Sequence, residues 1–274
     1  MPFFMDLHRG KEGRTLADIE EAHLRDVEAQ GRYGVNYISF FHDEASGAVY
    51  CVAEAPDADA CVAVHVEAIG DPPDAIIPVE PVLLDKFFGG QPPSQTGVML
   101  RPGGEPDPGV RTVMFTDIVD STRLTDELGD ATGVKLVRVH DRIVQDRLAS
   151  SDGSMVKHTG DGLMAAFVSC DDAVTCAIGV QEDLSSYRSG DHALPLEVRI
   201  GLHVGEPVAA HGDLFGLAVN IARRICDAGG PGEILVSAAV RDQLAATVAI
   251  DALGPHEFKG VSRPIEVHRV HWGR

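Results

Sequence analysis

The sequence predicts an α+β protein with two domains, each built from the element order βαββαβ. Its 274 residues exceed the length of one ordinary domain. The hydrophobic content of 44% and the charged content of 24% are typical of a folded globular protein. Glycine and proline crowd together over residues 89–109, where the apolar periodicity stops. We therefore expect domains at 1–82 and 110–274, joined by a linker over 83–109.

The first domain alternates strand and helix patterns. Its expected elements, in chain order, are a strand at 3–8, an amphipathic helix at about 15–29, strands at about 35–42 and 47–54, a helix at about 57–69 and a strand at about 76–82. This order suits a ferredoxin-like sandwich, in which two helices cover one face of an antiparallel sheet.

The second domain begins with the buried strand RTVMFTDIV. Ser121 or Thr122 then caps a long helix, whose apolar residues keep helical spacing to about Ala149. The expected elements that follow are a hairpin of MVKH and LMAAFV around the turn TGDG, a helix at about 172–184, the strand LEVRIGLHVGE, a helix containing VNIARRI, the strand EILV, a helix at about 237–246 and an antiparallel pair around HEFKG and IEVHRV. The core is again βαββαβ, and we expect the last pair to frame one edge of the sheet.

The charge of the chain limits its partners. Lysine and arginine number 23 against 42 aspartate and glutamate residues, so the formal net charge is −19. An acidic protein is a poor partner for nucleic acid or for an anionic membrane surface, because both need a basic face. A phosphate ligand must then arrive with its own cations. This balance favours a metal–nucleotide complex.

Cysteine usage and hydropathy indicate the compartment. The five cysteines are widely spaced, odd in number and without a CxxC pair, so we expect reduced thiols. The start of the chain lacks the pattern of a signal peptide, and no apolar stretch reaches the roughly 18 to 20 residues that span a bilayer. We therefore expect a cytoplasmic protein.

Two short motifs each place an aspartate where a strand ends. FTDIVDST contains Asp117, and HTGDG contains Asp161. If the two strands are neighbours, both carboxylates converge on one point. Magnesium prefers such oxygen ligands, and a pair of ions can activate an attacking oxygen and stabilise a leaving one. Alone, each aspartate is more typical of a turn cap, whereas the pair favours a metal site.

A third segment, HGDLFGLAVNIARRI, places Asn220 and Arg224 four residues apart. Residues at this spacing share one face of a helix, so the amide and the guanidinium could reach one substrate. Taken alone, the segment also fits a capped turn and a solvated ion pair.

Together these segments resemble the catalytic domain of class III adenylate and guanylate cyclases, over residues 110–271. In that family two metal-binding aspartates lie on the first strand and the following hairpin. A purine-selecting lysine precedes the second of them by four residues, and a selecting aspartate precedes an asparagine by seven, with an arginine four residues after the asparagine. All six positions carry the family's usual residues here. They are Asp117, Asp161, Lys157, Asp213, Asn220 and Arg224.

The resemblance implies an adenylate cyclase. In this reaction the ribose 3′-oxygen of ATP attacks the α-phosphorus, giving cyclic AMP, a signalling nucleotide, and pyrophosphate. Two Mg²⁺ or Mn²⁺ ions would bridge Asp117 and Asp161, with the carbonyl of Ile118 as a further ligand. The backbone amides at 118–122, which open a helix, would hold the triphosphate.

The other four residues would recognise the substrate. By resemblance, Lys157 donates to adenine N1 and Asp213 accepts from the adenine amino group, which favours ATP over GTP. Asn220 would orient the ribose, and Arg224 would stabilise charge on the α-phosphoryl oxygens. In the family the metal aspartates come from one subunit and these four residues from the other. The resemblance therefore implies a homodimer with two composite sites.

Two other functions remain open. One is a guanylate cyclase, and the other is a catalytically quiet, nucleotide-binding regulatory dimer. A polymerase-like palm also pairs acids on such a sheet, but the helix with Asn220 and Arg224 is not expected there.

Three residues near these motifs stand apart from the six. Arg223 occupies a position where the family usually has alanine or serine, and Leu217 replaces a common acidic residue. Arg223 either pairs with an acidic neighbour or competes for phosphate. We interpret His203, in a strand, as structural.

Residues 1–82 resemble a small ferredoxin-like family that includes a nickel-responsive protein, through MDLHRG, EAHLRD, GAVYCVAEAPDA and VHVEAIG. A helical histidine common in that family is Ile69 here. Imidazole and thiol groups are suitable ligands for nickel or another transition metal. The candidate ligands are His8, His23, His42, Cys51 and His65. The alternatives are a metal sensor and a dimerisation or small-ligand module.

Overall fold

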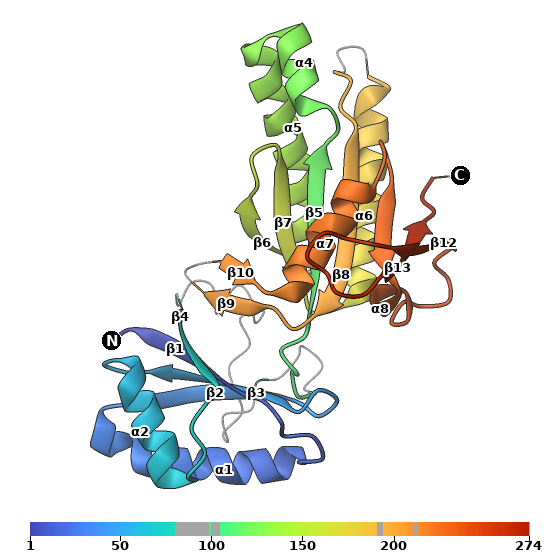
Figure 1. Cartoon of the computed structure of the whole chain (residues 1–274). Coiled ribbons are helices and arrows are strands. Elements are labelled where there is room, and N and C mark those ends of the chain that lie inside the picture. The colour runs from blue at the N-terminus through green and yellow to red at the C-terminus, as the bar shows by residue number, and fades with distance from the viewer. Residues whose placement is uncertain (80–98, 100–104, 191–193, 211–212, 274) are drawn as a thin grey trace. The chain divides into compact units, whose positions relative to one another are not determined.

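The computed structural model describes residues 1–79, 99, 105–190, 194–210 and 213–273. The chain divides into two compact units, Met1–Val110 with Val208–Leu214, and Arg111–Pro207 with Phe215–Arg274 (Figure 1). Most of the linker predicted over 83–109 lies outside the described residues. In the part of the chain that is described, no helix combines the length and the apolar content that a membrane span needs.

The first unit has the predicted order βαββαβ. Its elements are β1 (Phe3–His8), α1 (Leu16–Ala29), a 3₁₀ turn (Gln30–Tyr33), β2 (Asn36–Asp43), β3 (Ala48–Glu54), α2 (Ala58–Ala68) and β4 (Ala75–Val79). The strands form an antiparallel sheet in the order β2-β3-β1-β4. Both helices pack on one face of this sheet (Figure 1). The ferredoxin-like prediction for this unit is confirmed.

Local capping sets where the two helices of the first unit begin. The Thr15 hydroxyl accepts from the amide of Asp18, and the Asp18 carboxylate accepts from the amide of Thr15 at 2.8 Å, a reciprocal capping box. Asp57 accepts from the amide of Ala60 at 2.9 Å at the start of α2. Ile19, Cys61 and Val64 then pack the apolar sides of both helices into the core.

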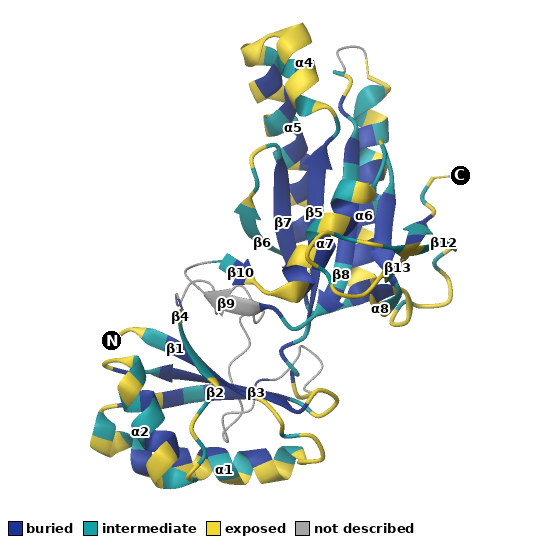
Figure 2. Cartoon of the chain, viewed as in Figure 1, coloured by how far each residue is buried: buried dark blue, intermediate teal, exposed yellow. Residues whose placement is uncertain are grey.

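The second unit is built on a seven-stranded sheet in the order β12-β13-β11-β8-β5-β7-β6. Its strands are β5 (Arg111–Ile118), β6 (Ser154–His158), β7 (Gly162–Phe167), β8 (Val198–Gly205), β11 (Ile234–Ser237), β12 (Ile250–His256) and β13 (Ile265–Val270), and its helices are α4 (Ser121–Leu128), α5 (Asp130–Ala149), α6 (Cys170–Arg188), α7 (Leu217–Ala228) and α8 (Ala238–Arg241). Every residue of β5 is buried between β7 and β8, as Figure 2 shows. The last strand pair frames one edge, as predicted.

Helices cover both faces of this sheet. Thr112 contacts Cys170 of α6 and Thr116 contacts His140 of α5, whereas Phe115 lies beneath Arg223 of α7. Because strand side chains alternate between faces, α5 and α6 lie on one face and α7 on the other. Even-numbered residues of β5 therefore face α5 and α6, and odd-numbered residues face α7.

Several boundaries in the second unit differ from the prediction. The helix expected from Ser121 to Ala149 is interrupted at Gly129, whose φ of 85° no helix allows. The helix expected at 237–246 ends at Arg241, because the amide of Ala245 is held by Asp171 at 3.0 Å. The strand expected around HEFKG lies earlier, as β12. Glycine and proline usually disfavour a strand, but β12 lies at the edge of the sheet, where Gly254 and Pro255 are tolerated.

A short hairpin, β9 (Val208–Ala210) with β10 (Asp213–Phe215), was not predicted. Its strands have three residues each, which is too short for a periodic pattern.

Candidate active site

Asp117 and Asp161 come from neighbouring strands of the second unit, as the motifs predict. Asp117 is paired in register with Gly162, the first residue of β7, and Asp161 directly precedes it. The amide of Ile118 donates to the backbone oxygen of Asp161 at 3.4 Å. A Cβ on Gly162 would lie 2.0 Å from the backbone oxygen of Thr116, so only glycine permits this close approach.

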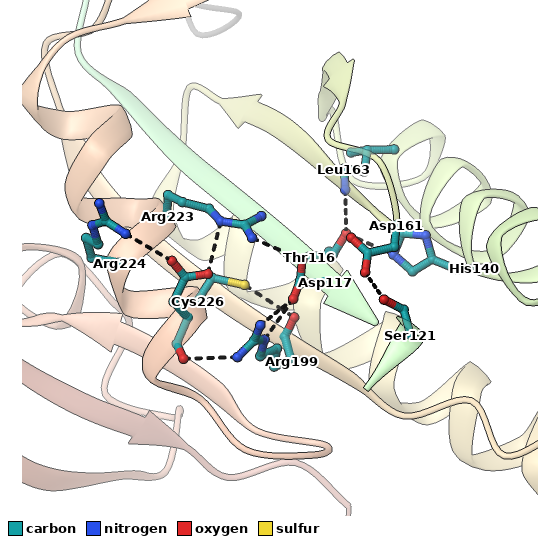
Figure 3. Close-up of polar contacts among 11 residues, drawn as sticks. Thr116, Asp117, Ser121, His140, Asp161, Leu163, Arg199, Arg223, Arg224 and Cys226 are labelled. Atoms are coloured by element: carbon teal, nitrogen blue, oxygen red, sulfur yellow. Dashed lines mark hydrogen bonds and ion pairs between the residues drawn. The ribbon is translucent and has the colours of Figure 1, made fainter. Parts of the chain in front are cut away.

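A tight turn presents the second aspartate. The amide of Thr159 donates to the backbone oxygen of Gly162 at 2.9 Å, and Gly160 has a φ of 95°. Asp161 therefore sits at the end of the turn, partly exposed. Its Oδ2 accepts a hydrogen bond from the hydroxyl of Ser121, the first residue of α4 (Figure 3). The second carboxylate thus lies at the amino end of a helix.

Asp117 is 4% exposed and its carboxylate is held by two arginines. Arg199 of β8 donates from Nε and Nη2 to Oδ2, at 2.9 and 2.5 Å. Arg223 of α7 donates from Nη2 to Oδ1 at 3.2 Å. Burial acts against the charge of Arg199, but the bonds to Asp117 and its charge raise the pKa of Arg199 above its usual value. Each Asp117 oxygen therefore faces a cation (Figure 3).

A buried hydrogen-bond network supports the two aspartates from the other face. The Thr116 hydroxyl accepts from the amide of Leu163 at 3.2 Å and lies 2.9 Å from His140 Nε2. On the other side of its ring, His140 Nδ1 lies 3.0 Å from the carboxylate of Asp141. With Nδ1 protonated, His140 donates to Asp141 and accepts from Thr116, so each group is satisfied. This network ties β5 to β7 one residue from Asp117.

The sequence analysis missed Thr116, His140 and Arg199. Thr116 and His140 lie on elements that the sequence does place correctly, but 24 residues separate them. Arg199 lies in the strand that contains His203, which drew attention instead. His203 Nδ1 lies 2.8 Å from the Ser237 hydroxyl, and burial lowers the pKa of His203 to about 4. A neutral, hydrogen-bonded His203 fits the structural interpretation.

Asn220 and Arg224 lie away from the two aspartates. The buried face of α7 packs on the sheet, whereas Asn220 and Arg224 are on its exposed face. Arg224 Nη1 lies 3.5 Å from Asp227 Oδ2 and points away from Asp117 (Figure 3). The structure therefore separates these two residues from the carboxylates of the same chain.

The predicted purine-contacting residues lie in different units. Lys157 lies in β6 at a register shift that follows Met155, and a shift of this kind re-aims a side chain. Its Nζ lies 5.9 Å from the centre of the Phe215 ring. Asp213 opens β10, in the segment that groups with the first unit, and accepts from the amide of Leu214 at 2.7 Å.

The chemistry of the donor set fits a hard divalent cation. Asp117 and Asp161 offer carboxylate oxygens, and Ile118 offers a backbone carbonyl beside them. A cleft of about 1020 Å³ opens beside Asp161 and Ile118, lined also by Ser121 and the facing sides of α4 and α5, whereas Asp117 does not line it. Its volume is sufficient for a nucleotide-sized ligand.

In the first unit, Asp6, His8 and Cys51 form a second candidate metal site. One ligand atom from each lies within 4.8 Å of the others, and all three residues are buried. Asp6 and His8 share a face of β1, and Cys51 is opposite Asp6 on β3. Burial and the charge of Asp6 raise the pKa of the Cys51 thiol well above its usual value. A metal there would have to displace the thiol proton.

The other three candidate histidines take different positions. His65 lies between two buried acids, with Nε2 2.9 Å from Asp6 and Nδ1 3.1 Å from Asp26. The ring of His23 stacks obliquely on Phe40, 4.9 Å between centres. His42 lies on β2, and β3 separates β2 from the strand of His8, so two strand spacings of about 4.8 Å lie between them.

Comparison with protein-family models gives two matches. Residues 108–271 match the model described as the adenylate and guanylate cyclase catalytic domain. Residues 4–79 match the model described as the nickel responsive protein SCO4226-like family.

Curated relatives match the second unit. The uncharacterized protein Rv2212 of Mycobacterium tuberculosis is 34% identical over 157 residues, which cover 57% of this chain and 40% of that protein. The putative adenylate cyclase 3 of Rhizobium meliloti is 28% identical over 160 residues, covering 57% of this chain and 27% of that protein. The match thus spans less than half the length of these relatives.

Solved structures match the same part of the chain. The adenylyl cyclase CyaB of P. aeruginosa has a TM-score of 0.54 and 25% identity, over 60% of this chain and 95% of that one. An adenylate/guanylate cyclase/hydrolase from Silicibacter pomeroyi has a TM-score of 0.51 and 28% identity, over 59% of this chain and 95% of that one.

Proposed function

The chain belongs to the adenylate and guanylate cyclase catalytic domain family, and we propose that it converts ATP into 3′,5′-cyclic AMP and pyrophosphate. The observation that carries the proposal is the pair Asp117 and Asp161, on adjacent strands beside the amino end of α4. An acid pair beside unpaired helix amides suits a metal-bound triphosphate, because the amides and the helix dipole favour phosphate oxygens.

Asp117, Asp161 and the Ile118 carbonyl would hold the divalent ions. When bound, Mg²⁺ or Mn²⁺ lowers the pKa of the ribose 3′-hydroxyl and offsets charge on the phosphates. Arg199 keeps the Asp117 carboxylate in place through Oδ2. Ser121 holds Asp161 in the same way from the start of α4. Carboxylates held in place in this way need little rearrangement as charge develops.

ATP selectivity would come from Lys157 and Asp213. Lys157 can donate to adenine N1 and Asp213 can accept from the adenine amino group. Guanine has an acceptor and a protonated nitrogen at these positions, so both side chains would lose their partners. GTP turnover as high as ATP turnover would instead indicate a guanylate cyclase.

A homodimer would complete the site. Asn220 and Arg224 lie on the exposed face of α7, away from the carboxylates of their own chain, which supports their use by a partner's site. We expect Asp161→Ala and Arg224→Ala proteins to be inactive alone and to regain part of the activity when mixed, since mixed dimers contain one intact site. Verified mixed dimers without any activity would contradict the composite site.

An assay of the full chain tests the reaction itself. Cyclic AMP and cyclic GMP are measured after incubation with ATP or GTP, with Mg²⁺ or Mn²⁺. We expect cyclic AMP, with ATP preferred. ATP binding by a verified dimer without any cyclic product would support the alternative, a nucleotide-binding regulatory dimer.

The buried cluster of the first unit favours a second candidate function, transition-metal binding. Asp6 Oδ1 has no hydrogen-bond partner among the described residues, although it lies with His8 and Cys51 as a possible ligand set. Imidazole and thiolate suit nickel or a similar ion. Calorimetry with Ni²⁺ should show binding that Cys51→Ser removes and Cys61→Ser keeps, because buried Cys61 lies outside the set. Equal binding by both variants would contradict this site.

A further inference from the structure

The two arginines that hold Asp117 do so with different strength. Arg199 makes two bonds to Oδ2, and its Nη1 also donates to the backbone oxygen of Asp227 at 3.0 Å. Arg223 reaches Asp117 through a single bond of 3.2 Å to Oδ1. Arg199 is therefore fixed at three points, whereas Arg223 covers its oxygen weakly.

Arg223 has a second acidic partner on its own helix. Its Nε lies 3.0 Å from Asp227 Oδ1, one helical turn away, and its guanidinium carbon lies 5.8 Å from the centre of the Phe115 ring. The Arg223 side chain is 34% exposed, so water can solvate the donors that leave Asp117. Arg223 can therefore move from Asp117 to Asp227 and solvent at small cost.

We propose that Arg223 is an internal competitor of the metal ion at Asp117. It covers Oδ1, the oxygen that Arg199 leaves open, and withdraws to Asp227 when a divalent cation binds there. This inference rests on the proposed function, which assigns the metal to Asp117.

The charges around Asp117 indicate how Arg223 should change the affinity of the site for a divalent cation. With Arg223 in place, the three acids of the site, Asp117, Asp161 and Asp227, are balanced by the three guanidinium groups of Arg199, Arg223 and Arg224, and an entering cation meets no net attraction. With Arg223 removed, one negative charge is uncompensated, and the Asp117 oxygen facing α7 is free to bind. Arg223 thus raises the divalent ion concentration at which the site fills.

Direct Mn²⁺ binding tests this without relying on turnover. Electron paramagnetic resonance measures free Mn²⁺ over a titration of the nucleotide-free full chain. The Mn²⁺ binding that Asp117→Asn abolishes is assigned to the Asp117 site, and only this binding is compared between variants. Mn²⁺ bound elsewhere on the protein is thereby excluded. We expect Arg223→Ala to lower the Mn²⁺ dissociation constant of the Asp117 site by about tenfold, the size expected for one partly screened charge at close range.

Arg224→Ala is the matched control for Mn²⁺ binding. It removes the same charge from the next position of α7, but Arg224 contacts Asp227 and lies on the exposed face. Its Mn²⁺ dissociation constant should stay within about twofold of the unsubstituted chain. Thermal unfolding checks that each variant is folded, and Arg223→Gln replaces Arg223→Ala if the latter is not.

Two results would overturn the competition. In the first, Arg223→Ala and Arg223→Gln leave the Mn²⁺ affinity unchanged or weaken it. In the second, Arg224→Ala tightens Mn²⁺ binding as much as the Arg223 variants do, so the effect would come from net charge alone. A third result has a wider consequence. If Asp117→Asn binds Mn²⁺ like the unsubstituted chain, the metal assignment of the proposed function fails, and the competition fails with it.

Discussion

The two units both bury carboxylates, and they neutralise them in different ways. In the second unit, Asp117 faces Arg199 and Arg223, whose guanidinium groups stay charged at any physiological pH. In the first unit, Asp6 and Asp26 share the single imidazole of His65. We therefore expect the charge of the Asp117 site to respond to competing cations, and the charge of the buried Asp6, Asp26 and His65 cluster to respond to pH.

Burial alone would lower the pKa of His65. Hydrogen bonds to Asp26 and Asp6, together with their charges, raise it instead to about 9. His65 is thus an imidazolium near neutral pH, and the two acids around it keep one excess negative charge. This cluster is an ionic core that a change of pH can unbalance.

The largest expected effect is the loss of activity when the Asp117 carboxylate is removed. We expect Asp117→Asn to lower cyclic nucleotide formation by roughly a thousandfold, because a neutral amide holds a divalent ion poorly and leaves two arginines without their counter-charge. Product formation per mole of folded protein measures this.

Asp120→Asn is the control for that substitution. Asp120 lies three residues further on, is exposed, and pairs with Arg123. Asparagine also tolerates its left-handed backbone, with a φ of 55°. We expect the activity of Asp120→Asn to stay within a few-fold of that of the unsubstituted chain. A loss as large as that of Asp117→Asn would show that activity depends on negative charge near the start of α4 and not on metal coordination by Asp117.

The next effect tests the other half of the comparison. His65→Ala leaves Asp6 and Asp26 buried without their shared cation, and breaking a buried pair in this way costs about 3 kcal/mol or more. Urea unfolding of the full chain, followed by a probe of the first unit, measures the free energy. His23→Ala, which removes a buried histidine of the same unit that packs on Phe40, should cost less. Equal costs would mean that His65 acts by packing alone.

The sequence predicted the order of elements well, because strands and amphipathic helices repeat with clear periods. It also predicted that Asp117 and Asp161 lie at the ends of neighbouring strands, since each ends a strand next to a glycine turn or a helix start. It could not predict Arg199 or His140 as their partners. Those contacts depend on register across the sheet and on which helix covers each face, which no local pattern encodes.

Composition misled the prediction at the ends of elements. Gly129 was interpreted as part of a continuous helix, and the strand expected around HEFKG was placed too late, because an edge strand accepts Gly254 and Pro255. In the first unit, histidine and cysteine drew attention as ligands, whereas Asp6 was missed because a carboxylate alternating along a strand looks like a solvent-facing residue.

The pH dependence of stability should be moderate. The folded pKa of His65 lies above its unfolded value of about 6.5, so the stabilisation is complete below pH 6.5 and is lost as pH rises through about 9. We expect the free energy of unfolding of the first unit to fall by about 2 kcal/mol from pH 7 to pH 9. His65→Gln should flatten this slope. An unchanged slope in that variant would place the titrating group elsewhere.

The smallest effect concerns the hydrogen-bond network behind Asp117, which tests whether position as well as charge sets the proposed metal site. Thr116→Val keeps the shape of the side chain but removes the hydroxyl that joins His140 to the amide of Leu163, so β5 and β7 lose one tie beside the carboxylates. We expect the free energy of unfolding to fall by about 1 kcal/mol. We also expect the Mn²⁺ dissociation constant to rise by about tenfold, as for other groups that orient metal ligands.

Thr116→Ser separates position from packing. Serine restores the hydroxyl and loses only a methyl group, so Mn²⁺ affinity should return while the small packing loss remains. A purely structural role for Thr116 would instead lower the stability of both variants and leave the Mn²⁺ affinity of both unchanged. In that case the arginines alone, and not the hydrogen-bonded strand pair, would define the geometry at Asp117.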